Sequence, residues 1–565
     1  MAVHVWGLVA IIVFYLLIFI LGIWAARKNK KKGKEATSED ILLAGRNIGT
    51  YLGIFTLTAT WVDGALISGV AEGIYTSGLS SLSMPLGYCM STILAAFFFV
   101  KKMREGNNVT MLDPFDRKFG KIMTGFLFLP ALSGDMFWCA ATLSSLGTTL
   151  TVVVGLDHWI AITVSAAVVL IYTLFGGLYS VSYTDVMQML FIFVGLWLAI
   201  PFALSNPLMT SLSETTEKWV GTLPNHDIST YIDILLQLMF GGIPWQVLWQ
   251  RALAMKSSRL AEVMLYAGAL GFVVCTIPPL LIGMVAVSVD WNATAYDGEL
   301  PFPADDLKLI APLVLQYVCP FVVSLIGLGA ISAAVMSSAD SILLSSSSMF
   351  SNNIYKPARM GKASERELIW AMRVFMTLMA ILTTVLAIEI TSIFALAILC
   401  SDLVYVILFP QFTSVLFVDG ANIYGSIAGY VLGLIIRVLS GEPLLGLRAV
   451  LRWPWYEAET DFQPFPYRTG CMLLSFLTIL LVSYVTNVAF LTGWLPRRYD
   501  VLNGIVWYSE SKPKEPSDEN WSAQNEKNEF VDLEILPRRK MEVNEAEDDG
   551  SEEVSRLEQE PLTSN

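Results

Sequence analysis

Charged residues are scarce in this chain: they make up 15% of its 565 residues, whereas soluble globular proteins contain about 25%. Hydrophobic residues reach 55%, and the mean hydropathy is +0.58. An ordinary soluble enzyme is therefore excluded. Only 36 Lys and Arg stand against 49 Asp and Glu, so the chain also lacks the basic excess that binding to a phosphate backbone requires.

Cysteine and histidine are also rare, with six and three copies. All six cysteines fall within apolar stretches, which favours small buried hydrophobic side chains over a disulfide scaffold. There is no CxxC pair, no Ser/His/Asp or Cys/His arrangement and no phosphate-binding loop. The sequence therefore gives no support to an enzyme.

Long apolar stretches fill most of the chain. A helix needs about 20 mostly apolar residues to cross a bilayer, and only helices satisfy their backbone groups within such a segment. We predict an all-α membrane protein with about thirteen transmembrane helices, from the stretches 5–26, 51–75, 80–100, 122–154, 158–178, 184–204, 231–250, 262–287, 307–350, 367–388, 391–417, 422–440 and 468–494. The stretch 307–350 is long enough for one long helix plus a shorter piece.

Basic residues gather in alternate loops. They are concentrated in 27–46, 101–121, 251–259 and 356–366, while 288–306 contains none. By the positive-inside rule, the basic loops are cytoplasmic. We therefore expect an extracellular N-terminus and a cytoplasmic C-terminus, with Arg251 in a cytoplasmic loop. The sequon at Asn292 falls in an outer loop, where a glycan can be attached.

The composition changes near residue 495. From Glu510 onward there are 17 acidic and 7 basic residues, so this segment carries about −10 of the chain's net charge of −13. Its content of Glu, Ser, Asn and Pro predicts disorder. We expect a membrane domain at 1–494 and an acidic, disordered cytoplasmic tail at 495–565 that offers a binding segment for trafficking adaptors.

Two of the predicted helices are interrupted near mid-membrane. Residues 58–65 read TATWVDGA and residues 241–246 read GGIPWQ, five helices later. Broken backbone at this depth is tolerated only beside a cavity that protein lines, and paired breaks in two halves indicate a secondary-transporter binding site. The alternative is that these glycines merely let helices pack closely.

Hydroxyl groups and a carboxylate follow in the ninth helix, where residues 337–341 read SSADS. Together with unwound carbonyls at a break, they would suit a small hard cation. Serine runs in membrane helices also serve packing and interhelical hydrogen bonds, and this alternative stays open. The acid Asp340 is costly inside a membrane unless it lines a polar path or has a partner.

Tryptophans stand at both breaks, Trp61 at the first and Trp245 at the second, and Tyr88 and Trp138 follow glycines in the third and fourth helices. Most membrane tryptophans belong to interfacial belts. At a helix break, however, a cage of aromatic faces would bind a quaternary ammonium group through cation–π attraction, about 0.5–2 kcal/mol per contact. This favours a cationic or methylated amine as substrate over a sugar.

At these residues the chain resembles the sodium/solute symporter family, most closely its choline-transporting branch, over about residues 1–495. The general family pattern is matched by 172–181 (YTLFGGLYSV) and 183–188 (YTDVMQ). The choline branch is matched by 110–115 (TMLDPF), 241–246 (GGIPWQ), 337–341 (SSADS) and 401–405 (SDLVY).

The resemblance implies a LeuT-like fold of five-plus-five inverted repeats, with one helix before the repeats and two after them. It implies sodium-coupled, chloride-dependent uptake of choline or a related cationic amine by alternating access, in the plasma membrane, with synaptic or vesicle membranes as further locations. The family's sodium site matches the carbonyls of Ala59, Val62 and Ala334 and the hydroxyls of Ser337 and Ser338. Its choline cage matches Trp61, Tyr88, Trp138 and Trp245.

The chain departs from the choline branch around the first break. Residues 61–69 read WVDGALISG, where that branch generally reads WVGGGYING. We count Asp63 among the substrate-binding candidates because a carboxylate beside the cage would attract a cation. The alternative is that Asp63 caps the second half of the broken helix. A symporter for a different organic solute, a non-transporting ligand sensor and an ion-conducting protein remain alternative functions.

Overall fold

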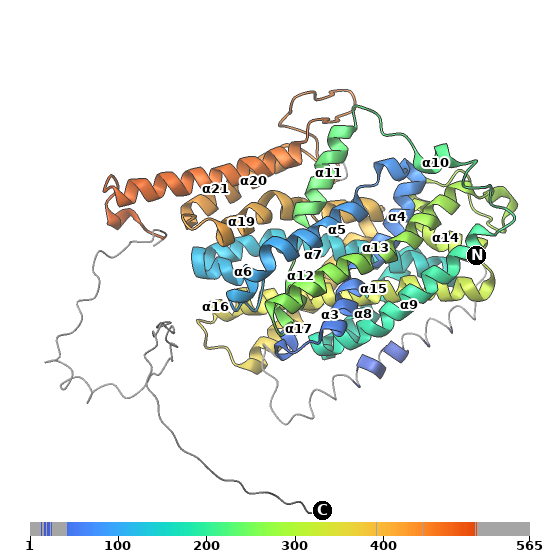
Figure 1. Ribbon diagram of the computed structural model, residues 1–565, viewed down its shortest axis with the longest axis horizontal. Coiled ribbons are helices and arrows are strands. Elements are labelled where there is room, and N and C mark those ends of the chain that lie inside the picture. The colour runs from blue at the N-terminus through green and yellow to red at the C-terminus, as the bar shows by residue number, and fades with distance from the viewer. Residues whose placement is uncertain are drawn as a thin grey trace, which may run out of the picture. The chain divides into compact units, whose positions relative to one another are not determined.

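The computed structural model describes residues 42–502, apart from residues 391, 443 and 444, together with residue 504 and residues 9, 13, 16–18, 20–22 and 24. The described chain is built of helices and contains no β-strand beyond four isolated bridges (Figure 1). The predicted all-α class is therefore confirmed. Most of the first predicted stretch, 5–26, and nearly all of the acidic tail lie outside the described residues, as does the tail's predicted adaptor-binding segment.

The helices follow one another through short connections. In chain order they are α3 (Thr50–Trp61), α4 (Gly64–Ser77), α5 (Met84–Leu94), α6 (Val100–Glu105), α7 (Asp113–Val154), α8 (His158–Gly176), α9 (Leu178–Leu204), α10 (Thr216–Val220), α11 (Ile228–Gly241), α12 (Gln246–Ala254), α13 (Ser258–Ser288), α14 (Ile310–Val318), α15 (Phe321–Met349), α16 (Lys356–Ala358), α17 (Glu365–Glu389), α18 (Ile393–Leu399), α19 (Phe409–Phe417), α20 (Ile423–Leu439) and α21 (Tyr467–Leu491). Three π-helical segments, Ala95–Phe99, Phe350–Tyr355 and Val404–Leu408, join α5 to α6, α15 to α16 and the α18 region to α19. Short 3-10 turns lie at Ala44–Arg46, Leu79–Ser81, Trp291–Ala293, Ala304–Leu309 and Arg497–Tyr499.

Nine helical segments of the described chain are long and apolar enough to cross a membrane, and the bent pair α3–α4 makes a tenth. The count of thirteen helices and the inverted-repeat layout stay predictions. The stretch 307–350 does hold a short and a long helix, α14 and α15, because Pro320 precedes α15 and fixes an extended turn.

The helices differ in how far they are enclosed by protein. In the most apolar part of α7, 89% of the residues are buried, against 22% in α21, which packs along α20 at one edge of the bundle (Figure 1). Large exposed side chains such as Leu481 and Val374 lie on the outer helices α21 and α17. An apolar exposed surface of this kind is what a lipid-facing helix presents.

The core of the fold is the serine-rich helix α15. It packs against α9 on one side and against α7 on another, and it also contacts α3, α4 and α12. From Ala330 to Met349 every residue of α15 is buried. This helix therefore brings its hydroxyl groups to both interrupted segments.

Candidate functional site

The first break lies between α3 and α4, which are bent by 45°. Trp61 ends α3, Val62 and Asp63 leave the helical conformation, and α4 begins at Gly64. A methyl group added at Gly64 would lie 2.9 Å from Ser145 Oγ on α7, so the small residue is required by close packing. The helix is therefore broken here, and the break is also tightly packed.

The second break lies between α11 and α12, over residues 242–245. Two tryptophans satisfy carbonyl groups that the break leaves without helical partners. Trp245 Nε1 donates to the Gly241 carbonyl at 2.6 Å, and Trp249 Nε1 donates to the Ile243 carbonyl at 3.0 Å. This hydrogen bonding stabilises the non-helical backbone and fixes the direction of the Trp245 ring.

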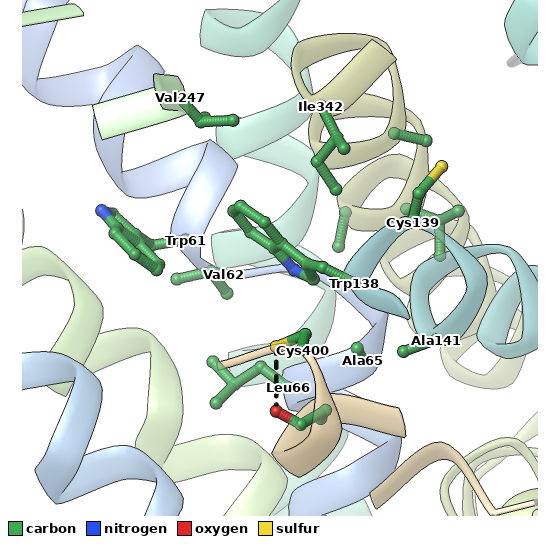
Figure 2. Close-up of a cluster of buried hydrophobic side chains, with 14 of the residues drawn as sticks. Trp61, Val62, Ala65, Leu66, Trp138, Cys139, Ala141, Val247, Ile342 and Cys400 are labelled. Atoms are coloured by element: carbon green, nitrogen blue, oxygen red, sulfur yellow. Dashed lines mark hydrogen bonds between the residues drawn. The ribbon is translucent and has the colours of Figure 1, made fainter. Parts of the chain in front are cut away.

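The structure brings together the four predicted cage residues, here called the aromatic cluster: Trp61, Tyr88, Trp138 and Trp245. The Trp61 ring lies 5.5 Å from Trp138, nearly parallel to it, and 5.6 Å from Tyr88. Trp245 meets Trp138 edge-on at 4.8 Å. Figure 2 shows Trp61 and Trp138 beside each other, with Cys400 and Leu66 next to them.

A small cavity lies within the aromatic cluster. Its lining consists of the four rings, Asp63, Ala65, Leu66, Met84, Ala397 and Cys400. The lining is almost entirely apolar, and Asp63 is its one charged residue. Such a pocket, apolar with a single placed charge, is typical of a site for a small organic cation.

Asp63 has three hydrogen-bond donors. Its Oδ1 accepts from the Leu66 amide at 2.5 Å, so it caps α4, and the capping interpretation is confirmed. Its Oδ2 accepts from Trp138 Nε1 at 2.5 Å and from Thr142 Oγ1 at 3.1 Å. The same carboxylate therefore orients a cluster ring and gives the cavity its negative charge.

The residues that match the family's sodium site meet where α15 crosses the end of α3. Ala59, Val62, Ala334, Ser337 and Ser338 are all fully buried. Ser338 Oγ donates to the Thr60 carbonyl at 2.9 Å and to the Ala334 carbonyl at 3.1 Å. The hydroxyl thus links α15 directly to the last turn before the break.

The rest of the serine run separates into two groups. Ser345 and Ser347 donate to carbonyls within α15, as the packing alternative requires. Ser337, Ser338 and Ser346 instead reach other helices. Asp340 is fully buried and accepts from Ser341 Oγ at 3.2 Å.

An ion pair that the sequence analysis missed lies beside Ser337. Arg251 on α12 and Asp185 on α9 have fully buried side chains, with 3.4 Å between guanidinium and carboxylate. Asp185 also accepts from Ser337 Oγ at 2.5 Å and from Thr56 Oγ1 on α3. Arg251 donates to Ser341 Oγ at 2.5 Å. The pair therefore connects α3, α9, α12 and α15 around Ser337.

The placement of Arg251 in a loop was wrong. The predicted stretch ended at residue 250, but the helix continues to Ala254 and carries Arg251 inward. The sequence did contain one signal that a buried arginine was needed. Asp185 lies within the predicted stretch 184–204, and an acid inside a membrane helix requires a basic partner.

Among the described residues, no group of three or more His, Cys, Asp and Glu side chains is arranged to hold a metal ion. The six cysteines are free thiols; five are buried, as predicted, and Cys89 is half-buried. Asn292 is exposed at the 3-10 turn Trp291–Ala293. Its side chain is therefore accessible to the glycosylation that we predict there.

Comparisons with known proteins point to one family. A model of the sodium:solute symporter family matches residues 41–433. The chain is 48% identical to the high-affinity choline transporter 1 of Drosophila melanogaster over 505 residues, which cover 89% of this chain and 82% of the relative. It is 44% identical to the human high affinity choline transporter 1 over 557 residues, which cover 96% of each chain.

A solved structure is similar to the fold. It is a Na+-coupled sialic acid symporter in a substrate-bound outward-open state, with a TM-score of 0.69 and 18% sequence identity over 85% of this chain and 97% of the other. At this identity the likeness concerns the fold alone.

Proposed function

This chain belongs to the sodium:solute symporter family, and from that membership we propose that it takes up choline together with sodium by alternating access. It is a membrane transporter and not an enzyme. The relatives that are 44–48% identical to it carry the name of choline transporters, which supports choline as the substrate.

The observation that carries the proposal is the aromatic cluster at the junction of the two helix breaks. A quaternary ammonium group cannot donate a hydrogen bond, so it is recognised by aromatic faces and negative charge. Three buried tryptophans, one tyrosine and the carboxylate of Asp63 line one cavity. We assign Trp61, Tyr88, Trp138, Trp245 and Asp63 to substrate binding.

We assign sodium to the carbonyls of Ala59, Val62 and Ala334 and the hydroxyls of Ser337 and Ser338. Oxygen ligands suit a hard cation, and these come from both sides of the contact between α3 and α15. Sodium held there would fix α3 against α15, and thereby the position of Trp61, which ends α3. Sodium and substrate would then favour the same conformation, which is the condition for coupling.

Further assignments follow from the family. We propose the LeuT-like five-plus-five repeat, thirteen crossings, a membrane domain at 1–494, an extracellular N-terminus and a cytoplasmic tail that binds trafficking adaptors. We also propose a plasma-membrane location, with synaptic or vesicle membranes as further sites, together with dependence on chloride and a glycan on Asn292. The basic loops support the orientation.

Counterflow tests the transport function. Proteoliposomes that contain the purified full chain are loaded with unlabelled choline and diluted into radiolabelled choline, with and without sodium. We expect labelled choline to enter against its own gradient when sodium is present. Current without labelled accumulation would instead indicate an ion-conducting protein, and uptake of another amine in place of choline would indicate a different substrate.

Ser338→Ala is expected to raise the sodium concentration for half-maximal uptake about tenfold, which is close to 1.4 kcal/mol of lost binding. The substitution removes both a proposed ligand and the hydrogen bond to the Thr60 carbonyl. Sodium titration of choline uptake measures the effect. Ser347→Ala is the matched control, since its hydroxyl donates only within α15. Equal sodium dependence in the two variants would contradict the assignment.

Asp63→Asn separates the two roles of that residue. Asparagine caps a helix as well as aspartate does, so a purely capping role predicts unchanged uptake. If the carboxylate acts on the substrate, through its charge or by orienting Trp138, the KM for choline should rise about tenfold. Uptake kinetics normalised to surface protein give the answer, and an unchanged KM would show that the charge does not act on the substrate.

A further inference from the structure

Asp135 is a buried carboxylate on α7 that the assignments above do not use. Its side chain is 2% exposed. It precedes Trp138 of the aromatic cluster by three residues, about 4.5 Å along the helix, on the same face. A charge so close to the proposed cage requires an explanation.

Asp135 has fewer partners than the other buried acids around it. Among the residues that the structure describes, its one side-chain hydrogen-bond donor is Ser346 Oγ on α15. By contrast, Asp63 has three donors, and Asp185 accepts from two hydroxyl groups, those of Ser337 and Thr56. Within the described part of the chain, no Lys, Arg or His side chain pairs with Asp135, whereas Asp185 has Arg251. A buried carboxylate without a cation is costly in a membrane protein.

Asp135 lies next to the wall of the cavity. A methyl group built on the preceding Gly134 would be 2.8 Å from the Cys400 carbonyl and 3.5 Å from Trp245 Cη2. Cys400 lines the cavity together with Asp63 and Trp245. The turn of α7 that carries Asp135 therefore packs against two lining residues, Cys400 and Trp245.

Polar side chains continue from Asp135 toward the loop that precedes α7. Ser346 is followed by Ser348, whose Oγ accepts from Gln246 Nε2 at 3.4 Å. Gln246 Oε1 accepts from the Met111 amide at 2.7 Å, and Asn353 then pairs with Thr110 and Asp113. These side chains are here called the polar seam. They run toward the basic loop that we propose to be cytoplasmic.

We infer that Asp135 is a second binding site for the transported organic cation, on the cytoplasmic side of the aromatic cluster. The carboxylate draws the ammonium group out of the cage and into the polar seam between α7 and α15, so that it speeds release. This inference rests on the proposed function and orientation. It adds Asp135, whose charge acts on the organic cation after the cation has left the aromatic cluster.

The ligand is the organic cation and not sodium because of the surrounding atoms. A hard cation gathers several oxygen ligands, and at Asp135 the structure offers one carboxylate and one serine hydroxyl. A quaternary ammonium group needs only charge and apolar contact, and the apolar side chains of Val404 and Trp245 lie beside the preceding Gly134.

Asp135→Asn in the full chain, reconstituted in proteoliposomes, tests the inference. We expect the equilibrium Kd for radiolabelled choline to stay within about threefold of wild type, while its efflux from preloaded vesicles slows about tenfold. Asp135→Glu restores the charge and should recover at least about a third of the efflux rate, which separates loss of charge from misfolding. Asp233→Asn is the matched control, since it removes a buried carboxylate on α11 that accepts from the Arg468 backbone amide and from Thr469 Oγ1.

Each outcome has one meaning. Wild-type efflux in Asp135→Asn overturns the inference and leaves the proposed function intact. A shift in sodium dependence with normal choline efflux assigns Asp135 to sodium and overturns it as well, as does equal slowing in Asp233→Asn. If the wild-type protein itself does not move choline in this assay, the proposed function fails, and the inference fails with it.

Discussion

Replacing Trp138 with leucine is expected to raise the KM for choline by about 100-fold or to abolish uptake. Trp138 stacks against Trp61 at 5.5 Å, meets the edge-on ring of Trp245 at 4.8 Å and donates to Asp63 at 2.5 Å. The substitution removes a cation–π face, loosens two more and takes a donor from the buried carboxylate. These losses act on the same cavity, so the effect exceeds that of one ring contact.

Two further variants identify the cause of the higher KM for choline. Trp138→Phe keeps an aromatic face but loses the indole N–H, so its KM should fall between wild type and Trp138→Leu. Trp370→Leu removes a largely exposed tryptophan on α17 and should transport like wild type. Concentration-dependent uptake, normalised to protein in the membrane, gives the three values. A KM for Trp138→Leu equal to that of Trp370→Leu would exclude the aromatic cluster as the substrate site.

Breaking the Arg251–Asp185 pair should cost the most stability. Arg251→Gln leaves Asp185 buried without its cation, a change that typically costs about 3–5 kcal/mol. Because the pair joins four helices, the unfolding temperature in detergent should fall sharply, and the yield of folded protein with it.

The double variant Arg251→Gln/Asp185→Asn tests whether charge pairing is the cause. Removing both charges removes the uncompensated carboxylate, so the double variant should be more stable than Arg251→Gln alone. Thermal unfolding of the wild type, the two single variants and the double variant completes the cycle. Strictly additive losses would mean that the two side chains do not stabilise each other.

Much of the fold was predictable because a bilayer imposes strict rules. Helix length, apolar content and the breaks at 58–65 and 241–246 follow from the need to satisfy backbone groups without water. The break positions then selected Trp61 and Trp245, and the structure places both against Trp138. The division of the stretch 307–350 was predictable too, since proline stands just before α15.

Partnerships across helices were not predictable. Nothing in the sequence pairs Asp185 with Arg251, since 66 residues separate them, and an arginine at the end of an apolar stretch is ordinarily a loop residue. The contact between Trp138 and Asp63 likewise depends on how α7 crosses the break. Because of this contact, the Asp63 carboxylate orients a ring in addition to capping a helix, and the sequence does not indicate the first of these roles.

Sodium-driven concentration of choline tests the central claim most directly. The purified full chain in proteoliposomes is given radiolabelled choline on both sides and then an inward sodium gradient. The predicted result is a transient rise of internal choline above the external concentration, which a sodium ionophore abolishes. Internal choline that never exceeds the external concentration, with or without the gradient, would contradict the claim that this protein is a sodium–choline symporter.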